Sequence, residues 1–148
     1  MGAQQNYLHV VPKWQNNISK SVMNSSLDMA NAFAEIWDIK SMLKQERVYV
    51  IYFDADRKVI RHELLNIGRI SQSMFDQRMA VEYAFECGAS YIAIAHNHPS
   101  GNSTPSRPDF ALTKEFQDTL RRLDMCLVDH IILTPTNYYS FQDHGYLK

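Results

Sequence analysis

Apolar residues recur at helical spacing in three parts of the chain. The first part runs from Ser25 to Met42, and its apolar residues follow one another at intervals of three to five. Ser25 and Asp28 are placed to cap its start. Similar amphipathic patterns cover residues 76–87 and 109–123, and each predicts a helix with one apolar face.

Short segments dense in Val, Ile, Tyr and Phe lie between these helical patterns and predict strands. Residues 47–54 and 59–67 flank a polar turn, so we expect them to form a hairpin-like pair. Residues 91–95 are almost wholly apolar, which is typical of a strand buried on both faces. A strand at residues 125–133 and a short segment near residues 139–142 complete the pattern.

The order of these elements predicts the fold class. Helix, two strands, helix, strand, helix and strand follow one another, which favours an α/β domain with a mixed sheet flanked by helices. The length of 148 residues fits one domain with its own core. We therefore expect a single domain over residues 25–148, preceded by a polar, partly irregular N-terminal arm at residues 1–24.

Composition narrows the class of protein. The hydrophobic fraction of 45% and the charged fraction of 21% are ordinary for a soluble globular protein. No apolar run approaches the ~20 residues that span a bilayer, and the first residues lack a signal-peptide pattern, so we expect a cytoplasmic protein without membrane attachment. Cys87 and Cys126 form no CxxC pair, and we interpret them as small buried side chains.

The charge balance argues against a dedicated nucleic-acid binder. The chain has 15 basic and 16 acidic residues and a net charge of −1, whereas such binders usually carry a basic excess. The best candidate basic patch lies on or beside the third predicted helix, where acidic residues dilute it, and it consists of Arg107, Lys114, Arg121 and Arg122. We expect DNA binding no tighter than about 10⁻⁵ M at physiological salt.

The most informative stretch follows the buried strand and contains two histidines. His96 and His98 are two residues apart, and in extended backbone such side chains point to the same side. A loop rich in Pro and Gly then leads to Asp109, which it can return to the histidines. Two imidazoles and one carboxylate suit zinc and leave a fourth position for water, as in catalytic sites. A lone His-x-His pair is usually incidental, so the interpretation depends on the whole set.

The segment HNHPSGNSTPSRPD resembles the JAMM (MPN-plus) signature, in which His-x-His is followed by seven residues, Ser, two residues and Asp. His96, His98, Ser106 and Asp109 match it without a gap. The extended form is similar to that of the RadC family, and the resemblance covers about residues 25–148. It implies a JAMM/MPN-like, cytidine-deaminase-like fold and a zinc site with His96, His98 and Asp109 as ligands.

The resemblance also implies two catalytic residues. Glu46, at the start of the first core strand, corresponds to the general base that takes a proton from the zinc-bound water. Ser106 corresponds to the hydroxyl that stabilises the developing oxyanion. From the residues alone, Glu46 reads as an exposed residue at a strand start, and Ser106 reads as the cap of the following helix. Glu63 is the nearest rival base, but it lies in the middle of the second strand.

Two further features have no assigned role. Asp129 and His130 lie on an apolar strand, where we favour a satisfied structural pair, with support of a metal ligand as the alternative. Arg78 corresponds to an arginine that the family places between Pro and Glu. Here its neighbours are Gln77 and Met79, so no role is carried over to it.

Three functions are compatible with these features. The first is a zinc peptidase or isopeptidase that acts on a protein or peptide amide, and we favour it. The second is a zinc hydrolase of another substrate, such as a nucleic acid or a small amide, which includes the DNA-repair label of the RadC family. The third is a non-catalytic interaction domain that keeps the metal for stability. The sequence identifies neither the substrate nor the oligomeric state.

Overall fold

The computed structural model describes residues 23–68 and 75–148 of the chain. A five-stranded sheet forms its centre, with helices on both faces. In chain order the elements are α2 (Ser26–Ile36), the short 3-10 helix η2 (Ile39–Ser41), β1 (Arg47–Phe53), β2 (Val59–Ile67), α3 (Gln77–Cys87), β3 (Tyr91–Asn97), α4 (Arg107–Arg122), β4 (Cys126–Leu133) and β5 (Tyr138–Ser140).

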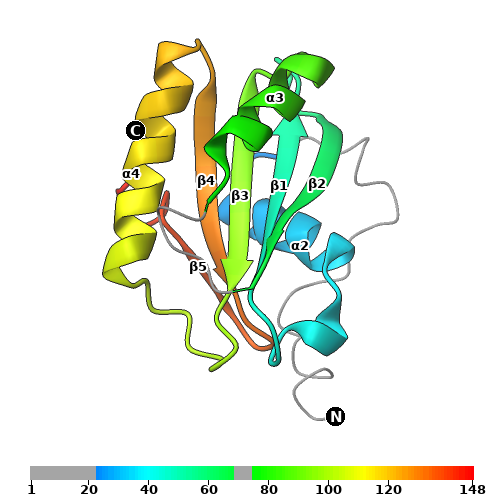
Figure 1. The fold of residues 1–148 in the computed structure, drawn as a ribbon, viewed down its shortest axis with the longest axis vertical. Coiled ribbons are helices and arrows are strands. Elements are labelled where there is room, and N and C mark those ends of the chain that lie inside the picture. The colour runs from blue at the N-terminus through cyan, green and yellow to red at the C-terminus, as the bar shows by residue number, and fades with distance from the viewer. Residues whose placement is uncertain (1–22, 69–74) are drawn as a thin grey trace.

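The sheet is mixed, and its strands follow the order β2-β1-β3-β4-β5. β1 is antiparallel to both β2 and β3, β3 and β4 are parallel, and β5 is antiparallel to β4. The parallel pair is joined through α4, because parallel strands need a crossover connection rather than a tight turn. β3 therefore lies at the centre of the sheet (Figure 1).

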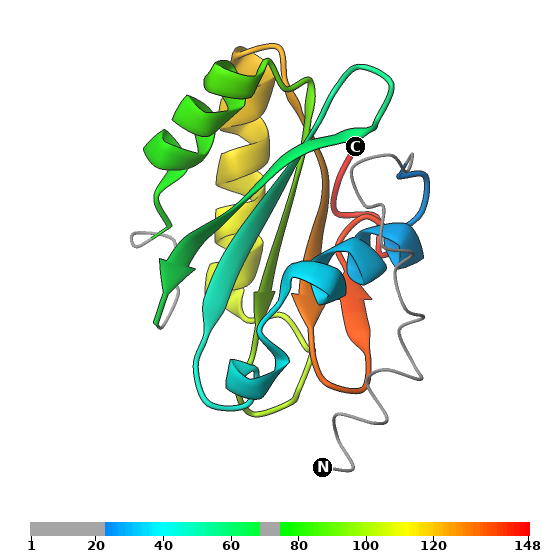
Figure 2. The same ribbon diagram turned by 90° about the vertical axis from the view of Figure 1, so that its right-hand side faces the viewer.

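Two apolar layers hold the helices on the sheet. On one face α2 packs through Phe33 against side chains of β1, β3 and β4, and Trp37 at its C-cap joins the same apolar layer. On the other face α3 and α4 pack through residues such as Phe116 and Leu120. Figure 2 shows α2 on one side of the sheet and α3 and α4 on the other. Burial of large apolar side chains on both faces of β1 and β3 explains why these strands read as continuous apolar runs.

The ends of the helices follow local capping chemistry. The Ser25 side chain accepts a hydrogen bond from the backbone N–H of Asp28 at 3.1 Å and begins α2. Asp76 caps α3 in the same way, and Gly88 ends it in the left-handed conformation with φ of 69°. A residue with a Cβ is disfavoured in that conformation, which is why glycine suits this position.

The structure confirms the predicted α/β domain with a mixed sheet and flanking helices, and it corrects three details. The first helix ends at Ile36, where Trp37 turns extended, rather than at Met42. The third begins at Arg107 rather than Asp109, because a proline is tolerated in a first helical turn. Phe85 of α3 does not face the sheet with Ala84, since it is 63% exposed.

The predicted arm at residues 1–24 lies almost entirely outside the described residues. Within residues 23–68 and 75–148, each helix is too short or too polar to cross a bilayer. The predicted Tyr139–Gln142 segment corresponds to β5, which begins one residue earlier and is three residues long.

Candidate metal centre

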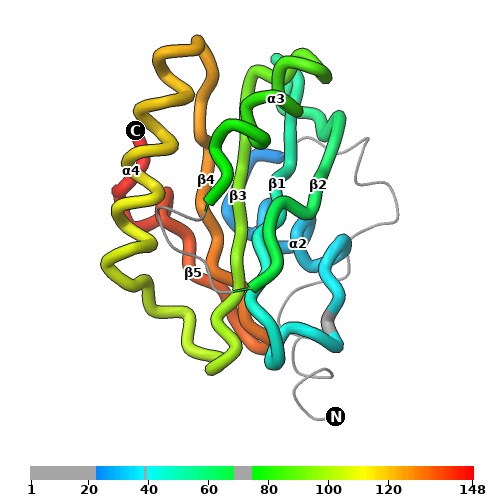
Figure 3. The backbone as a smooth tube through the Cα atoms, viewed as in Figure 1, coloured from blue at the N-terminus to red at the C-terminus, as the bar shows by residue number. Residues whose placement is uncertain are grey.

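The strand β3 places His96 between the sheet and the first turn of α4, where its ring contacts Asp109. Side chains alternate along the strand, so that Ile92 and Ile94 pack on the side of α3 and α4, whereas Ala93 and Ala95 pack on the side of α2. His96 continues the first series and is 1% exposed. Figure 3 shows how the chain leaves β3 at this end of the sheet and returns through a loop to the beginning of α4.

Ligand-type atoms of three residues meet at this point. His96 Nε2 lies 3.1 Å from Asp109 Oδ1, and His98 Nε2 lies 3.1 Å from Asp109 Oδ2. The two Nε2 atoms are themselves 3.1 Å apart. Ligand atoms bound at 2.0–2.1 Å in a tetrahedron are about 3.3 Å apart, so the spacing fits one small metal ion. The structure thus brings together the three residues that the sequence predicted as ligands.

The loop after β3 fixes the orientation of the His98 ring. The carbonyl oxygen of Asn102 lies 2.7 Å from His98 Nδ1. Because a carbonyl only accepts, this nitrogen carries the ring proton, and in the neutral ring Nε2 keeps its lone pair. The turn that brings Asn102 into place includes a hydrogen bond from Gly101 N to His98 O at 2.8 Å. The lone pair of His98 therefore points towards Asp109 and His96.

The N-terminus of α4 fixes Asp109. Ser106 is the N-cap residue, and its side-chain oxygen accepts from the backbone N–H of Asp109 at 3.3 Å. In return, Asp109 Oδ2 accepts from the backbone N–H of Ser106 at 2.8 Å. This reciprocal capping box stabilises the first turn and holds the carboxylate toward the histidines. The structure thus shows the contacts of the capping role of Ser106, and its oxyanion role stays a prediction.

The electrostatics of the site favour a cation. Burial raises the pKa of Asp109, but the contacts from His96 and His98 and the Ser106 N–H outweigh it and hold that pKa well below its usual range. The hydrogen bond to Asp109 raises the pKa of His98, against the lowering effect of its own burial. A carboxylate that stays ionised at 5% exposure, beside two imidazole nitrogens, attracts either a proton or a metal ion.

Glu46 lies beside these atoms at the start of β1. One carboxylate oxygen of Glu46 and one ring nitrogen each of His96 and His98 all lie within 4.8 Å of one another. The Glu46 residue is half-buried. Its backbone carbonyl oxygen accepts a hydrogen bond from the backbone N–H of Gly68 at 2.8 Å. The structure therefore places Glu46 within reach of a molecule bound to the metal centre.

Asn97, which sequence reasoning left without a role, positions the segment that carries Glu46. Asn97 lies between the two histidines in the sequence and is fully buried. Its side chain faces the opposite side of the sheet from theirs. Its Oδ1 accepts from the Arg47 N–H at 2.8 Å, and its Nδ2 donates to the carbonyls of Met42 and Gln45 at 2.6 and 3.0 Å. The signal in the sequence is the position itself, since a polar residue at the buried end of an apolar strand needs partners.

The side chains of Asp129 and His130 do not pair with each other as favoured, because adjacent residues on β4 point to opposite faces of the sheet. The ring of His130 faces the metal centre, where its Nε2 lies 2.8 Å from His96 Nδ1. Burial, followed by repulsion from His96, lowers the pKa of His130 well below its usual value, so its ring stays neutral. Arg78 is exposed on the first turn of α3.

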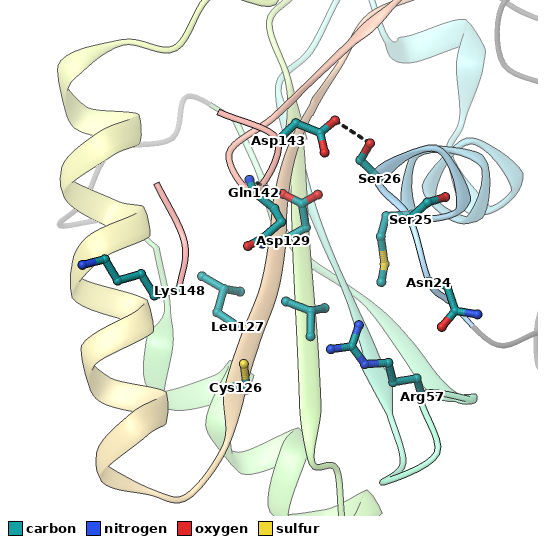
Figure 4. A pocket seen from close by; sticks show the side chains of 12 residues that line it. Asn24, Ser25, Ser26, Arg57, Cys126, Leu127, Asp129, Gln142, Asp143 and Lys148 are labelled. Carbon is teal, nitrogen blue, oxygen red and sulfur yellow. Dashed lines mark hydrogen bonds between the residues drawn. The ribbon is translucent and has the colours of Figure 1, made fainter. Parts of the chain in front are cut away.

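Asp129 lines a cavity of about 260 Å³ on the side of α2, near Gln142 and Asp143 (Figure 4). Its Oδ2 accepts from Ser140 Oγ at 2.6 Å, and its Oδ1 accepts from the backbone N–H groups of His130 and Gln142 at 2.7 and 3.1 Å. Burial outweighs these three bonds and raises the pKa of Asp129 to about 6. A buried acid of this kind couples the stability of the fold to pH.

The stability of the metal-free protein is expected to fall as pH rises from about 4 to about 6. Within this window the folded Asp129 holds a proton that the unfolded chain has lost, because the unfolded pKa is about 3.9. We expect Asp129→Asn to remove the fall, which amounts to about 2–3 kcal/mol, since its amide can donate to Ser140 Oγ. Urea unfolding of both proteins at several pH values, with a chelator present, measures the difference. Parallel pH profiles would contradict the assignment.

The fold and the site together define a class of protein. A mixed sheet flanked by helices, with a His-x-His pair at the end of its central strand and an aspartate in the first turn of the next helix, is the arrangement of a JAB-like domain. The sequence model of the RadC-like JAB domain matches residues 23–146. The chain therefore belongs to the RadC-like JAB domain family, which confirms the resemblance predicted from the motif.

Several curated proteins are similar to this chain over the same region. The UPF0758 protein YkfG of Escherichia coli strain K12 is 37% identical over 105 residues, which cover 71% of this chain and 66% of that protein. A UPF0758 protein of Flavobacterium johnsoniae is 36% identical over 115 residues, which cover 78% and 50%. One of Streptococcus suis is 35% identical over 102 residues, which cover 69% and 42%. The chain spans about half the length of the curated relatives it matches.

Proposed function

We propose that this domain is a zinc-dependent hydrolase of amide bonds, in which Glu46 is the general base. The observation that carries the proposal is the meeting of His96, His98 and Asp109 at 3.1 Å, with the Glu46 carboxylate within 4.8 Å of both imidazoles. Three protein ligands of this kind are typical of catalytic zinc sites, which keep a position open. Zinc held there lowers the pKa of a bound water and polarises a carbonyl group.

The residues around the metal divide the remaining chemistry. Glu46 accepts a proton from the attacking water and returns it to the leaving amine, as a carboxylate does when it is near but not bound to the metal. His98 and Asp109 are held by the loop and the helix N-terminus described above, so both keep their orientation during the reaction. The Ser106 hydroxyl donates to the substrate carbonyl oxygen as negative charge develops there, while its backbone N–H stays bonded to Asp109.

The proposed substrate is a protein or peptide amide rather than a nucleic acid. The basic residues around α4 are partly engaged, since Lys114 pairs with Asp118 at 3.1 Å and Arg121 donates to the carbonyl of Lys148 at 3.0 Å. Tight phosphate binding needs several convergent cations, and the net charge of −1 supplies no excess of them. An amide carbonyl, by contrast, is the group that a metal, a base and a hydroxyl donor are arranged to act upon.

The proposed role of Glu46 as general base can be tested separately from zinc binding. Glu46→Gln is expected to keep zinc and to lower the hydrolysis of a quenched peptide library by about 100-fold or more, because the amide cannot accept the proton. Glu63→Gln is the matched control, since Glu63 is likewise half-buried and lies on β2, where its carboxylate is paired with Arg61 at 2.7 Å.

Each of the other outcomes would assign different roles to the residues of the site. Loss of zinc in Glu46→Gln would make Glu46 a ligand rather than a base. Loss of activity in Glu63→Gln alone would move the base to β2. A zinc-loaded protein that cleaves no peptide or isopeptide would favour the metal-stabilised interaction domain.

A further inference from the structure

A buried chain of hydrogen bonds leads from the backbone of α4 through β4 to the metal centre. Thr113 Oγ1 lies 2.7 Å from the carbonyl oxygen of Asp109 and 2.6 Å from His130 Nδ1. On the other side of the ring, His130 Nε2 lies 2.8 Å from His96 Nδ1. Thr113, His130 and His96 are each 2% exposed or less. Because these side chains are buried, the contacts from Asp109 O to His96 Nδ1 are satisfied by the protons of the side chains themselves.

The protons of this chain can be placed by counting donors and acceptors. A carbonyl oxygen only accepts, so the single hydroxyl proton of Thr113 is donated to Asp109 O. Thr113 Oγ1 must then accept from His130 Nδ1, which carries the one ring proton of the neutral His130. His130 Nε2 is left with a lone pair, and it accepts from His96 Nδ1. His96 Nε2, the atom at the candidate metal centre, is thereby left with a lone pair directed at Asp109 Oδ1 and His98 Nε2, an arrangement that a bound cation would complete.

We propose that Thr113 and His130 are positioning residues that fix His96 in the one neutral tautomer able to bind a metal. The inference rests on the metal centre of the proposed function and not on hydrolysis. The carbonyl of Asn102 likewise fixes the tautomer of His98, so the tautomers of the two imidazoles are fixed by two separate sets of hydrogen bonds. The carbonyl that accepts the Thr113 hydroxyl proton belongs to Asp109, itself a proposed ligand. One end of the hydrogen-bond chain therefore holds a ligand residue by its backbone, and the other end holds a ligand ring.

Thr113→Val is the sharpest test, because valine has nearly the shape of threonine and Thr113 touches the proposed ligand residues only through the backbone carbonyl of Asp109. Without the hydroxyl, the proton on His130 Nδ1 faces no acceptor, which is unfavourable in a buried site. The ring of His130 then favours its proton on Nε2, where it is donated to His96 Nδ1. The His96 proton is driven to Nε2, the atom that must bind the metal. Thr113→Ser is the matched control, since it keeps the hydroxyl and loses only a methyl group.

Two measurements read the result. Long-range proton–nitrogen correlation spectra of the metal-free protein, labelled with nitrogen-15 at histidine, report which ring nitrogen of His96 is protonated. Competition with a chromophoric chelator reports the zinc affinity. We expect the proton on Nδ1 in the native protein and in Thr113→Ser, and on Nε2 in Thr113→Val. We also expect the zinc affinity of Thr113→Val to fall about 10- to 100-fold, as for other groups that orient metal-bound histidines.

A second pair of variants covers the case in which Thr113→Val does not fold. His130→Gln offers an amide oxygen that accepts from His96 Nδ1 without help from Thr113, whereas His130→Leu offers none. The glutamine variant is expected to bind zinc at least about tenfold more tightly than the leucine variant.

The proposal is overturned if the native protein carries the His96 proton on Nε2, or if Thr113→Val keeps both the native tautomer and the native zinc affinity. Equal affinity in the two His130 variants would also overturn it. The spectra decide the tautomer even if the protein holds no zinc, in which case the proposed function fails alone. A protein whose zinc affinity depends on Thr113 and His130 as expected, but which hydrolyses nothing, would leave the inference standing.

Discussion

Replacement of His96 and His98 by alanine is expected to remove the metal from a protein that otherwise carries about one zinc ion per chain. Two of the three ligand atoms disappear, and the buried carboxylate of Asp109 alone does not hold zinc against solvent. Elemental analysis after dialysis measures the loss. A full complement of zinc in the double variant would contradict the metal centre assigned here.

The same pair of proteins also separates loss of metal from loss of fold. Zinc at about 100 times its dissociation constant stabilises a folded protein that binds it by about 2.7 kcal/mol, so added zinc should stabilise the native protein and leave the double variant unchanged. The control variant replaces the exposed His62 and His144 by alanine. It is expected to keep both the zinc content and the response to added zinc.

Asn97→Ala is expected to lower the free energy of unfolding by about 3–5 kcal/mol. The change removes three hydrogen bonds and leaves two carbonyls and one N–H of the Met42–Arg47 segment without their partner. Each net hydrogen bond contributes about 1 kcal/mol, and each buried group left unpaired costs about 1–3 kcal/mol. Urea unfolding measures the change.

The control for this variant is Asn137→Ala, because Asn137 is exposed and its side chain makes one hydrogen bond, to Thr134. We expect it to cost about 1 kcal/mol or less. Asn97→Asp is informative beside it, since the acid keeps the acceptor for Arg47 but turns a charged oxygen toward two carbonyls. A loss below about 1 kcal/mol in Asn97→Ala would show that the segment is held by other contacts.

The sequence predicted most of the fold because its helices and strands have distinct apolar periods. β1, β2 and β4 read directly as apolar or alternating segments, and Ser25, Asp76 and Gly88 mark helix ends through local chemistry. The start of α4 was placed two residues late, because Pro108 was assigned to the loop although its missing N–H is harmless in a first turn. The end of α2 at Ile36 has no such local marker.

The candidate ligands were predictable because their spacing is local, whereas the groups that hold them are not. His96, His98, Ser106 and Asp109 lie within a single short stretch of the chain. The partner of His96 comes from β4, 34 residues away, and the partners of Asn97 come from the segment before β1, more than 50 residues earlier. The sequence pattern therefore predicts the residues that meet at the candidate metal centre but not those that orient them.

The alternation of side chains along β3 gives the tripeptide His96-Asn97-His98 a meaning that depends on strand register. The two histidines face α4. The side chain of the asparagine between them lies on the other side of the sheet, where it hydrogen-bonds the segment at the start of β1 that carries Glu46. A slip of β3 by one residue would exchange the two faces, so that an amide would point at Asp109 and both imidazoles would point into the apolar layer under α2. The proposed ligands and the proposed base therefore depend on one and the same pairing of β1 with β3, and an incorrectly paired sheet would displace both at once.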